Sequence, residues 1–361
     1  MAEKADERFM RMALELARQG QGETSPNPLV GAVIIKDGKI VGKGYHKRVG
    51  GAHAEIEALR SARENARGGT LYVNLEPCCH YGRTNPCTDA ILEAGLKEVV
   101  YAITDPNPRV RGQGARRLKS AGVAVRSGVL AKRAEELNEV YLKYIQTGLP
   151  FVILKTAQSL DGRVATVTGD SRWISGEPAR KFAHRLRADA DAVAIGAGTL
   201  RADNPQLTVR LVAGRNPYRI IIARNIRFSP SLHLFANNQD GKTIVATGEE
   251  GAARLRSKDL IVWRMRSARA GIVLKEVLKR AGEFQISSLL VEGGGRLATS
   301  FLRERLVDRH YVVIAPMTIG RGIDSVGDIG VRKLRQSIQY RNPNFTLCGE
   351  DLLFSGYPVR S

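Results

Sequence analysis

The spacing of apolar residues in the first part of the chain predicts alternating helices and strands. Residues 3–18 carry apolar side chains at helical spacing, and residues 30–35 and 40–45 have the composition of strands. Asp37-Gly38 lies between those two strands and is a strong hairpin signal. The same pattern predicts further strands over 71–75, 99–103 and 123–126, and helices after residue 53, over 87–94, up to residue 121 and over 131–145. We therefore expect a five-stranded sheet with helices on both sides, which is an α/β layered domain.

A break separates this part from the second. Gly148-Leu149-Pro150 ends the predicted helix over 131–145, so we expect one domain over residues 1–147 and another over 148–361. A chain of 361 residues is long enough for two domains with separate cores. In the second domain the pattern predicts strands over 151–155, 192–195, 219–223, 243–247, 260–263, 288–291 and 310–315, two more near the C-terminus, and helices over 178–188, 271–281 and 297–305.

One stretch of the first domain combines residues that can bind and use a metal. His53 and Glu55 lie two positions apart at the start of a predicted helix. Cys78 follows the predicted strand over 71–75, and Cys87 opens the next helix. A His-x-Glu followed by two Pro-Cys pairs is the signature of zinc-dependent nucleobase deaminases. One imidazole and two thiolates fill three of the four tetrahedral positions of zinc and leave the fourth for water, whose proton the nearby Glu55 can transfer to a leaving amine.

Two other interpretations of these residues stay open from their spacing alone. The cysteines could be ordinary buried thiols, and a structural zinc site would take a fourth protein ligand, for which Cys79 and His80 are the candidates. The spacing also differs from the usual Cys-x-x-Cys, because eight residues separate Cys78 from Cys87. This longer loop narrows the family to which the chain can belong.

Composition narrows the classes of protein and of partner. The formal net charge is +20, which would suit nucleic-acid binding, but the chain has no long Lys/Arg run and no interleaving of aromatic and basic residues. Phosphorylated small ligands explain the charge more simply, so we expect no nucleic-acid partner. No apolar run approaches the ~20 residues that span a membrane, and the charged, amphipathic N-terminus is typical of a helix and not of a signal peptide. With three of its four cysteines in the zinc stretch, the chain is expected in a reducing cytoplasm.

Glycine-rich turns are the candidate ligand site of the second domain. Gly196 and Gly198 follow one predicted strand, and glycines 293–295 follow another and precede a helix. Backbone can approach a phosphate closely at such turns, and the N-terminus of a helix offers free N–H donors. Neither turn has the G-x-G-x-x-G pattern, so a standard dinucleotide-binding fold is not supported. Taken alone, these turns are equally compatible with plain tight connections.

Longer motifs resemble those of one family over essentially the whole chain. The first half contains SPNPLVGAV, HAE, LEPCCHYGRTNPC and DPNPRVRGQG, and the second contains LKTAQSLDGRVA, GDSRWIS, DAVAIGAGTLRADNPQLTVR and VEGGGRL. These motifs, including the long Cys-to-Cys loop, are similar to those of the bifunctional deaminase–reductases of riboflavin biosynthesis. The resemblance implies a cytidine-deaminase-like three-layer α/β domain followed by a dihydrofolate-reductase-like domain.

The resemblance also implies two consecutive reactions. The first domain would deaminate 2,5-diamino-6-ribosylamino-4(3H)-pyrimidinone 5′-phosphate hydrolytically at a zinc ion. The second would use NADPH to reduce the ribosyl group to ribityl, giving 5-amino-6-ribitylamino-uracil 5′-phosphate. Family analogy also predicts a homodimer. The alternative is a zinc deaminase of another nucleobase, or of RNA, with a second domain that does not catalyse.

Individual positions match the functional residues of that family. His53, Cys78 and Cys87 match the zinc ligands, and Glu55 matches the proton shuttle. The positions that match substrate-binding residues are Asn27, His46 and Arg83 in the first domain and Ser171, Arg187, Leu207, Arg210 and Glu292 in the second. The positions that match NADPH-contacting residues are Ala157, Trp173, Thr199, Asp203, Gly294, Gly295 and Arg296.

Some of these assignments also have a physical argument. Arg187 and Arg210 suit the 5′-phosphate, because a guanidinium binds phosphate through two parallel hydrogen bonds. Lys155 and Asp203 are the candidates for assisting the reduction as polar catalytic groups. Two positions depart from the family pattern, Cys79 where Ser is usual and Asn85 where Pro is frequent. We expect Cys79 to be a spectator and deamination to be retained.

Overall fold

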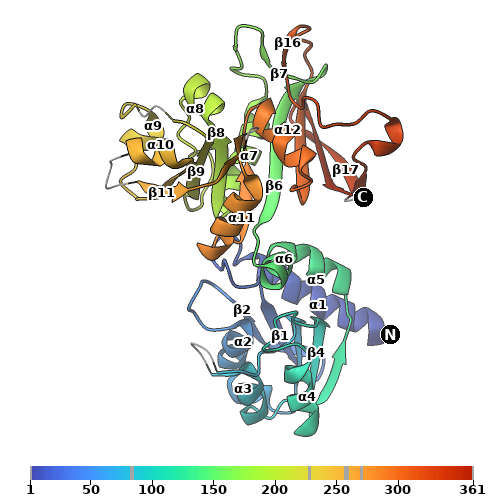
Figure 1. Ribbon diagram of the computed structural model, residues 1–361. Coiled ribbons are helices and arrows are strands. Elements are labelled where there is room, and N and C mark those ends of the chain that lie inside the picture. Colours follow the sequence, from blue (N-terminus) through green and yellow to red (C-terminus); the bar gives the residue numbers. More distant parts are fainter. Residues whose placement is uncertain (1, 82–84, 227–228, 256–259, 269–270, 360–361) are drawn as a thin grey trace. The chain divides into compact units, whose positions relative to one another are not determined.

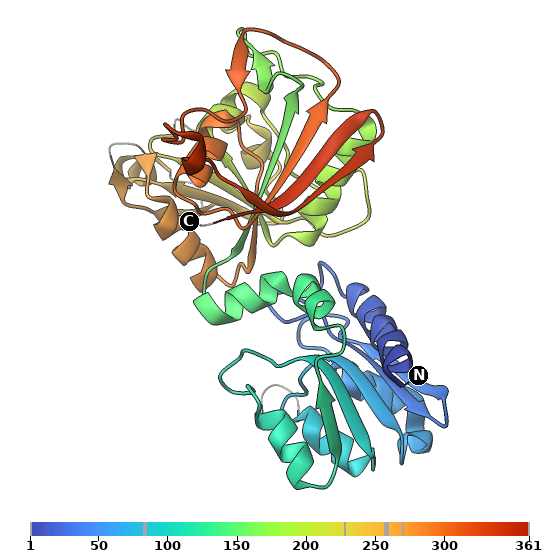
Figure 2. The same ribbon diagram turned by 90° about the vertical axis from the view of Figure 1, so that its right-hand side faces the viewer.

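Figures 1 and 2 show the computed structural model of the chain. It describes residues 2–81, 85–226, 229–255, 260–268 and 271–359. Two compact units divide the chain, Met1–Gly148 and Leu149–Ser361. Within the described residues, no helix combines the length and the apolar character needed to cross a membrane.

The first unit is built around one sheet. Over the described residues its strands pair in the order β2-β1-β3-β4-β5, which confirms the predicted five-stranded sheet. The strands are β1 (Gly31–Lys36), β2 (Lys39–Tyr45), β3 (Thr70–Leu75), β4 (Glu98–Ile103) and β5 (Ala124–Ser127). The helices are α1 (Ala2–Arg18), α2 (Ala54–Ala62), α3 (Cys87–Glu93), α4 (Gln113–Ser120), α5 (Ala131–Leu137) and α6 (Glu139–Thr147). The predicted hairpin at Asp37-Gly38 is also confirmed, since both residues have positive φ (49° and 71°), as a two-residue turn of this kind requires.

Helices cover both faces of this sheet and make three layers. On one face α2, α3 and α4 contribute Ala58, Ile91 and Leu118 to a core that includes the strand residues Ile34 and Val73. On the other face α1, α5 and α6 pack apolar side chains against the alternate strand residues. Alternation along the strands supplies both cores, because successive side chains of a strand point to opposite faces.

The single helix predicted over 131–145 is wrong, because the structure has two helices that meet at Asn138. The backbone of Asn138 leaves the helical region (φ −105°, ψ 15°). Its side-chain oxygen accepts the N–H of Leu29 (2.8 Å), and its amide donates to the Leu29 carbonyl (3.0 Å). Asparagine readily makes such bonds to main chain at the expense of helix geometry. The apolar spacing that continues across position 138 hid this interruption.

The second unit contains a larger, mostly parallel sheet. Over the described residues its strands pair in the order β11-β10-β9-β8-β14-β6-β15-β18-β17. These strands are β6 (Phe151–Ser159), β8 (Ala192–Gly196), β9 (Tyr218–Ala223), β10 (Thr243–Thr247), β11 (Ile261–Arg264), β14 (Ser288–Val291), β15 (Arg309–Ala315), β17 (Tyr340–Cys348) and β18 (Asp351–Pro358). Short pairs outside the sheet are β7 (Arg163–Thr166) with β16 (Gly322–Asp324), and β12 (Ser267–Ala268) with β13 (Gly271–Ile272).

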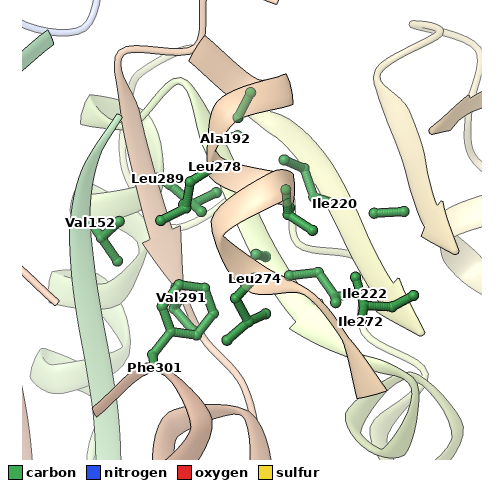
Figure 3. Packing of buried hydrophobic residues seen from close by; sticks show 14 of the residues in the cluster. Val152, Ala192, Ile220, Ile222, Ile272, Leu274, Leu278, Leu289, Val291 and Phe301 are labelled. Atoms are coloured by element: carbon green, nitrogen blue, oxygen red, sulfur yellow. The ribbon is translucent and has the colours of Figure 1, made fainter. Parts of the chain in front are cut away.

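Helices also cover this sheet from both sides (Figure 1). They are α7 (Glu177–Asp189), α8 (Ala197–Asp203), α9 (His233–Ala236), α10 (Glu249–Arg254), α11 (Leu274–Glu283) and α12 (Gly295–Arg303). Figure 3 shows the core beneath α11 and α12, in which Leu278 and Phe301 pack against strand residues such as Val152 and Ile220. On the opposite face, Leu186 of α7 belongs to a second core.

Two predicted elements of this unit have other bounds. The strand predicted over 151–155 continues to Ser159, because β6 pairs with β15 from Ile153 to Ser159. Polar residues in the second half of β6 hid this continuation from the apolar pattern. The helix predicted over 271–281 begins only at Leu274. Ile272 pairs with Ser267 in an antiparallel ladder, and the N–H of Val273 donates to the Arg266 carbonyl, so this backbone is engaged before the helix starts.

His310 of β15 should make the stability of the second unit depend on pH. Its ring is 4% exposed, between the Tyr340 hydroxyl (2.9 Å) and the Thr156 hydroxyl (3.4 Å). Burial lowers the pKa of His310 to about 4. Between that value and the usual ~6.5 the unfolded chain binds the proton and the folded chain does not, so stability falls as the pH falls, by at most about 1.4 kcal/mol per pH unit. Urea unfolding of wild type and His310→Gln should be measured at pH 7, 6 and 5. The free energy of unfolding of wild type relative to His310→Gln should decrease as the pH falls, and a difference that is the same at all three pH values would contradict this.

Candidate active sites

Three side chains of the first unit converge from different elements. His53 is the N-cap of α2, Cys87 is the first residue of α3, and Cys78 follows β3 in the intervening loop. The Nδ1 atom of His53 lies 3.2 Å from Cys87 Sγ and 3.4 Å from Cys78 Sγ. All three ligand atoms lie within 4.8 Å of one another. The structure therefore brings the three predicted metal ligands together, at the N-terminal ends of two helices.

This donor set fits a zinc ion. With ordinary bond lengths, tetrahedral zinc separates a nitrogen from a sulfur ligand by about 3.5 Å, close to the spacing of His53 from each thiol. Within the described part of the chain, no other His, Cys, Asp or Glu joins the cluster. Cys79, a candidate fourth ligand, instead lies 3.8 Å from the Arg109 carbonyl. A three-ligand set leaves a coordination position open, as catalytic zinc requires.

The local electrostatics favour a thiolate at Cys78. Its Sγ accepts the backbone N–H of Cys87 (3.4 Å) at the start of α3. A hydrogen bond with the Cys87 thiol, and then that with His53, lowers the pKa of Cys78 to about 4. The same contact with Cys78 raises the pKa of His53 to about 9. The proton held between these groups is the one that a metal displaces on binding.

Glu55 lies in the first turn of α2, next to this cluster. Its side chain is 4% exposed, and burial raises the pKa of its carboxyl group. The neighbouring His53 and the two thiols also act on that pKa. A carboxyl group whose pKa is raised toward neutrality can both accept and release a proton during a reaction.

Asn27 and His46 form a second layer beside the cluster. The His46 ring lies edge-on to that of His53, with centroids 5.7 Å apart. Nδ1 of His46 donates to the Ala52 carbonyl (3.0 Å), so Nε2 is the acceptor for Asn27 Nδ2 (3.2 Å). Burial lowers the pKa of His46, which keeps the ring neutral. The third predicted substrate residue of this domain, Arg83, lies outside the described residues.

Sequence reasoning missed the residues that hold these loops in place. Asn74 of β3 accepts the N–H of Gly31 and donates to the Leu29 carbonyl, both at 2.8 Å. Together with Asn138 it fixes the main chain next to Asn27. Glu76, which is 3% exposed, accepts the N–H groups of Gly112 (2.9 Å) and Ala115 (3.0 Å) and so anchors the chain just before Cys78. A polar residue inside an otherwise apolar strand, as at Asn74, was the available signal.

In the second unit, three predicted residues gather at the carboxyl-terminal side of the sheet. Arg187 of α7 donates from Nε and Nη2 to the two carboxylate oxygens of Glu292, at 2.7 Å each. Burial acts to raise the pKa of Glu292, but Arg187 and then Lys155 hold it below its usual value. Burial lowers the pKa of Lys155, and Glu292 acts in the opposite direction. The structure therefore places Lys155 in a buried polar group with this ion pair.

Ser171 and Asp203 form a separate pair in this unit. Burial raises the pKa of Asp203, against which Arg172 and a hydrogen bond with Ser171 act. Arg172 also donates to the Asp203 carbonyl at 2.6 Å. Trp173 is 70% exposed, with the Arg180 guanidinium 4.7 Å from its ring centroid. An exposed indole is not a core residue, and the part of its ring that Arg180 does not cover is accessible to a ligand.

The glycine-rich turns lie side by side, because β8 and β14 are neighbouring parallel strands. The N–H of Gly294 donates to the Thr199 hydroxyl (2.9 Å), which joins the start of α12 to α8. A Cβ at Gly295 would collide with the Asp324 carbonyl, so only glycine fits there. Close backbone at the ends of adjacent strands suits a nucleotide cofactor. Ala157 lies on β6, two residues after Lys155, and Arg296 is exposed in the first turn of α12.

Leu207 and Arg210 occupy the segment after α8. Leu207 is 3% exposed and has a positive φ (55°), so it shapes the segment from within the core. Arg210 contacts Gln206 through its guanidinium, and burial together with the charge of Arg187 lowers its pKa. The two arginines predicted to bind phosphate thus lie near enough to influence each other.

Comparison with known proteins matches both units to described families. Residues 150–354 match the RibD C-terminal domain, and residues 3–103 match the cytidine and deoxycytidylate deaminase zinc-binding region. The riboflavin biosynthesis protein RibD of Aquifex aeolicus (strain VF5) is 46% identical over 98% of both chains. That of Escherichia coli (strain K12) is 40% identical over 96% of this chain and 98% of its own.

Solved structures agree over nearly the full length. Acinetobacter baumannii RibD has a TM-score of 0.90 at 36% identity, covering 99% of this chain and all of that one. A Thermotoga maritima diaminohydroxyphosphoribosylaminopyrimidine deaminase/5-amino-6-(5-phosphoribosylamino)uracil reductase has a TM-score of 0.86 at 36% identity, with the same coverage. These matches confirm the expected pairing of a cytidine-deaminase-like with a reductase fold. The chain belongs to the RibD family, the riboflavin-biosynthesis enzymes that join a zinc-binding deaminase domain to an NADPH-dependent reductase domain.

Proposed function

We propose that this chain deaminates 2,5-diamino-6-ribosylamino-4(3H)-pyrimidinone 5′-phosphate and then reduces the ribosyl side chain of the product to ribityl. The observation that carries the proposal is the three-ligand cluster of His53, Cys78 and Cys87 with the buried Glu55 beside it. The similar T. maritima protein, described as a deaminase and reductase of these pyrimidines, supports this choice of substrate.

In the deaminase step, His53, Cys78 and Cys87 hold zinc, which when bound supplies an activated water for attack on the amino-bearing ring carbon. Glu55 takes a proton from that water and passes it to the amino group, which leaves as ammonia. The neutral His46 and Asn27 orient the pyrimidine. Arg83 belongs to the same proposal as a substrate contact.

In the reductase step, bound NADPH would supply the hydride for the ribosyl carbon. Arg187 and Arg210 bind the 5′-phosphate, and Ser171, Leu207 and Glu292 shape the substrate side of the site. The cofactor side consists of residues on the facing loops and strand ends, namely Ala157, Trp173, Thr199, Asp203, Gly294, Gly295 and Arg296.

Lys155 and Asp203 are the two candidates for the group that supplies the proton in the reduction. Burial shifts the pKa of each toward neutrality, down for Lys155 and up for Asp203, as a proton donor at neutral pH requires. A Lys155→Ala chain with an unchanged reductase kcat would leave Asp203 as the donor.

Removal of the metal should separate the two activities. Dialysis against a strong chelator should abolish ammonia release, because the reacting water loses its activating ion. NADPH oxidation should continue when the deaminated intermediate is supplied, and added Zn²⁺ should restore ammonia release. Deamination by a chain shown to be free of metal would contradict the proposed zinc site, as would a reductase that needs the ion.

A homodimer formed through the β15–β18–β17 end of the large sheet is part of the proposal. Register places Val312, Ile314, Phe345, Leu347, Leu352 and Phe354 on one side of these strands. Phe345 is 60% and Leu347 78% exposed. The other side is covered by α7, whose Phe182 packs on Tyr311. A second copy is the simplest partner for an open apolar face on an edge strand, since a two-fold axis makes one patch complementary to itself.

A charge on this face should dissociate the dimer. Leu347→Lys would bury an ammonium group between the two copies, so we expect light scattering to show a shift from dimer to monomer at micromolar concentration. Leu334→Lys is the matched control, because Leu334 is 90% exposed in a short 3₁₀ segment (Leu334–Gln336) outside this face. A wild type that is monomeric, or a Leu347→Lys variant that stays dimeric, would contradict this assignment.

The reduced thiols at the zinc site support a cytoplasmic location for the enzyme.

A further inference from the structure

His184 lies between the two arginines assigned to the phosphate, although no motif singles it out. It precedes Arg187 by one turn of α7 and is 5% exposed. Its Nδ1 accepts the backbone N–H of Arg210 at 2.9 Å and lies 3.4 Å from the N–H of Leu211. Its Nε2 lies 3.4 Å from Arg187 Nη1. The imidazole thus contacts the main chain that carries one arginine and the side chain of the other.

These contacts fix the protonation of the ring. A nitrogen that accepts a backbone N–H carries no proton, so the neutral His184 ring must have its hydrogen on Nε2. Burial, and then the charges of Arg187 and Arg210, lower the pKa of His184 to about 4. The ring therefore stays neutral at physiological pH, and Nδ1 remains an acceptor for the Arg210 amide.

The segment that carries Arg210 is held at successive residues. Arg187 Nη1 donates to the Thr208 carbonyl (3.3 Å), and the N–H of Val209 donates to Asn216 Oδ1 (2.8 Å). His184 holds the next N–H, that of Arg210. The Arg210 side chain itself contacts Gln206, which is neutral. The position of the Arg210 guanidinium relative to a bound anion thus depends on where the Arg210 main chain is held.

We propose that His184 is a positioning residue for the 5′-phosphate of the reductase substrate, because its neutral imidazole holds the Arg210 main chain where the guanidinium reaches the phosphate beside Arg187. This inference rests on the proposed function, in which Arg187 and Arg210 bind that phosphate. A positioning role differs from a purely structural role in one respect. Substitution of His184 should weaken binding of the phosphorylated substrate but not of NADPH.

Two variants of the full chain separate these roles. His184→Leu removes the acceptor and keeps an apolar side chain of moderate size, whereas the amide oxygen of His184→Gln can still accept the Arg210 N–H. Loss of one such bond should raise the KM for the phosphorylated, deaminated intermediate about tenfold in His184→Leu. The kcat and the KM for NADPH should stay within about twofold, and His184→Gln should recover most of the affinity. With the dephosphorylated intermediate, wild type and His184→Leu should have equal kcat/KM.

Several results would overturn the inference. They are an unchanged KM in His184→Leu, an equal loss with both forms of the intermediate, or no recovery in His184→Gln. A measurement on wild type serves if the leucine variant does not fold: ¹⁵N NMR should show an unprotonated Nδ1 at His184, and a protonated Nδ1 would refute the proposed contact. A wild type that does not reduce the intermediate would refute the proposed function itself, whereas normal reduction by wild type and His184→Leu alike would refute only this role.

Discussion

Glu55→Gln should lower the rate of ammonia release by about 10²–10⁴-fold, the usual contribution of a positioned acid–base group. The amide keeps the size of the side chain but cannot accept the proton of the attacking water. Because Glu55 contributes no atom to the cluster of metal ligands, the variant should still bind one zinc per chain. NADPH oxidation with the deaminated intermediate should be unchanged, since the substituted residue lies in the first unit.

Glu57→Gln is the matched control for that substitution. Glu57 is two residues further along α2 and pairs with Lys47 and Arg60 at the surface. The same chemical change there should leave ammonia release within about twofold, because exposed ion pairs contribute little. Deamination at the wild-type rate by a zinc-loaded Glu55→Gln chain would exclude Glu55 as the proton shuttle.

Arg187→Met should destabilise the second unit by about 3–5 kcal/mol, because it leaves the carboxylate of Glu292 buried without its partner. The two side chains are 13% and 10% exposed and share two hydrogen bonds. Glu292→Met alone should cost a similar amount, whereas the double variant should recover much of the loss, since neither member of the Arg187–Glu292 pair is then left buried without the other. Urea unfolding of the four chains measures the coupling between the two residues.

The control for this cycle lies on the same helix. Lys181 and Glu177 form an exposed pair in the first turns of α7, so Lys181→Met should change stability only slightly. If Arg187→Met lowered the free energy of unfolding no more than Lys181→Met does, the buried Arg187–Glu292 pair would not stabilise the second unit as described. A double variant as unstable as the sum of the single variants would likewise contradict the coupling.

The fold could be predicted from sequence wherever local chemistry and packing agree. Asp37-Gly38 predicts a two-residue hairpin because these residue types readily adopt the positive φ that such a turn needs. The prediction was wrong where the deciding contact is not indicated by the spacing of apolar residues. Asn138 divides a helix in order to bond to Leu29, and the pairing of Ile272 with Ser267 delays the start of α11. The Asn138–Leu29 contact spans 109 residues and lies outside any local window, whereas the Ser267–Ile272 pairing is local but is not indicated by apolar spacing.

The candidate sites show the same division. The spacing of His53, Cys78 and Cys87 predicts a cluster because zinc restricts the kind and number of its ligands. No motif marks His184, and Asn74 stands out only as a polar residue in an apolar strand, because both bond to main-chain atoms, for which any residue type can serve as partner. Such supporting residues have no motif of their own, and their partners become apparent only when the chain is folded.

The most direct test of the central claim follows both reactions on the full, zinc-loaded chain. The purified protein receives the diaminopyrimidinone phosphate and NADPH, and ammonia and NADPH absorbance are recorded together. The account predicts that ammonia appears first and that NADPH is then oxidised, one molecule for each ammonia released. Release of ammonia without NADPH oxidation, even when the deaminated intermediate is supplied, would contradict the assignment of the reductase domain, and neither signal from zinc-loaded protein would contradict the substrate.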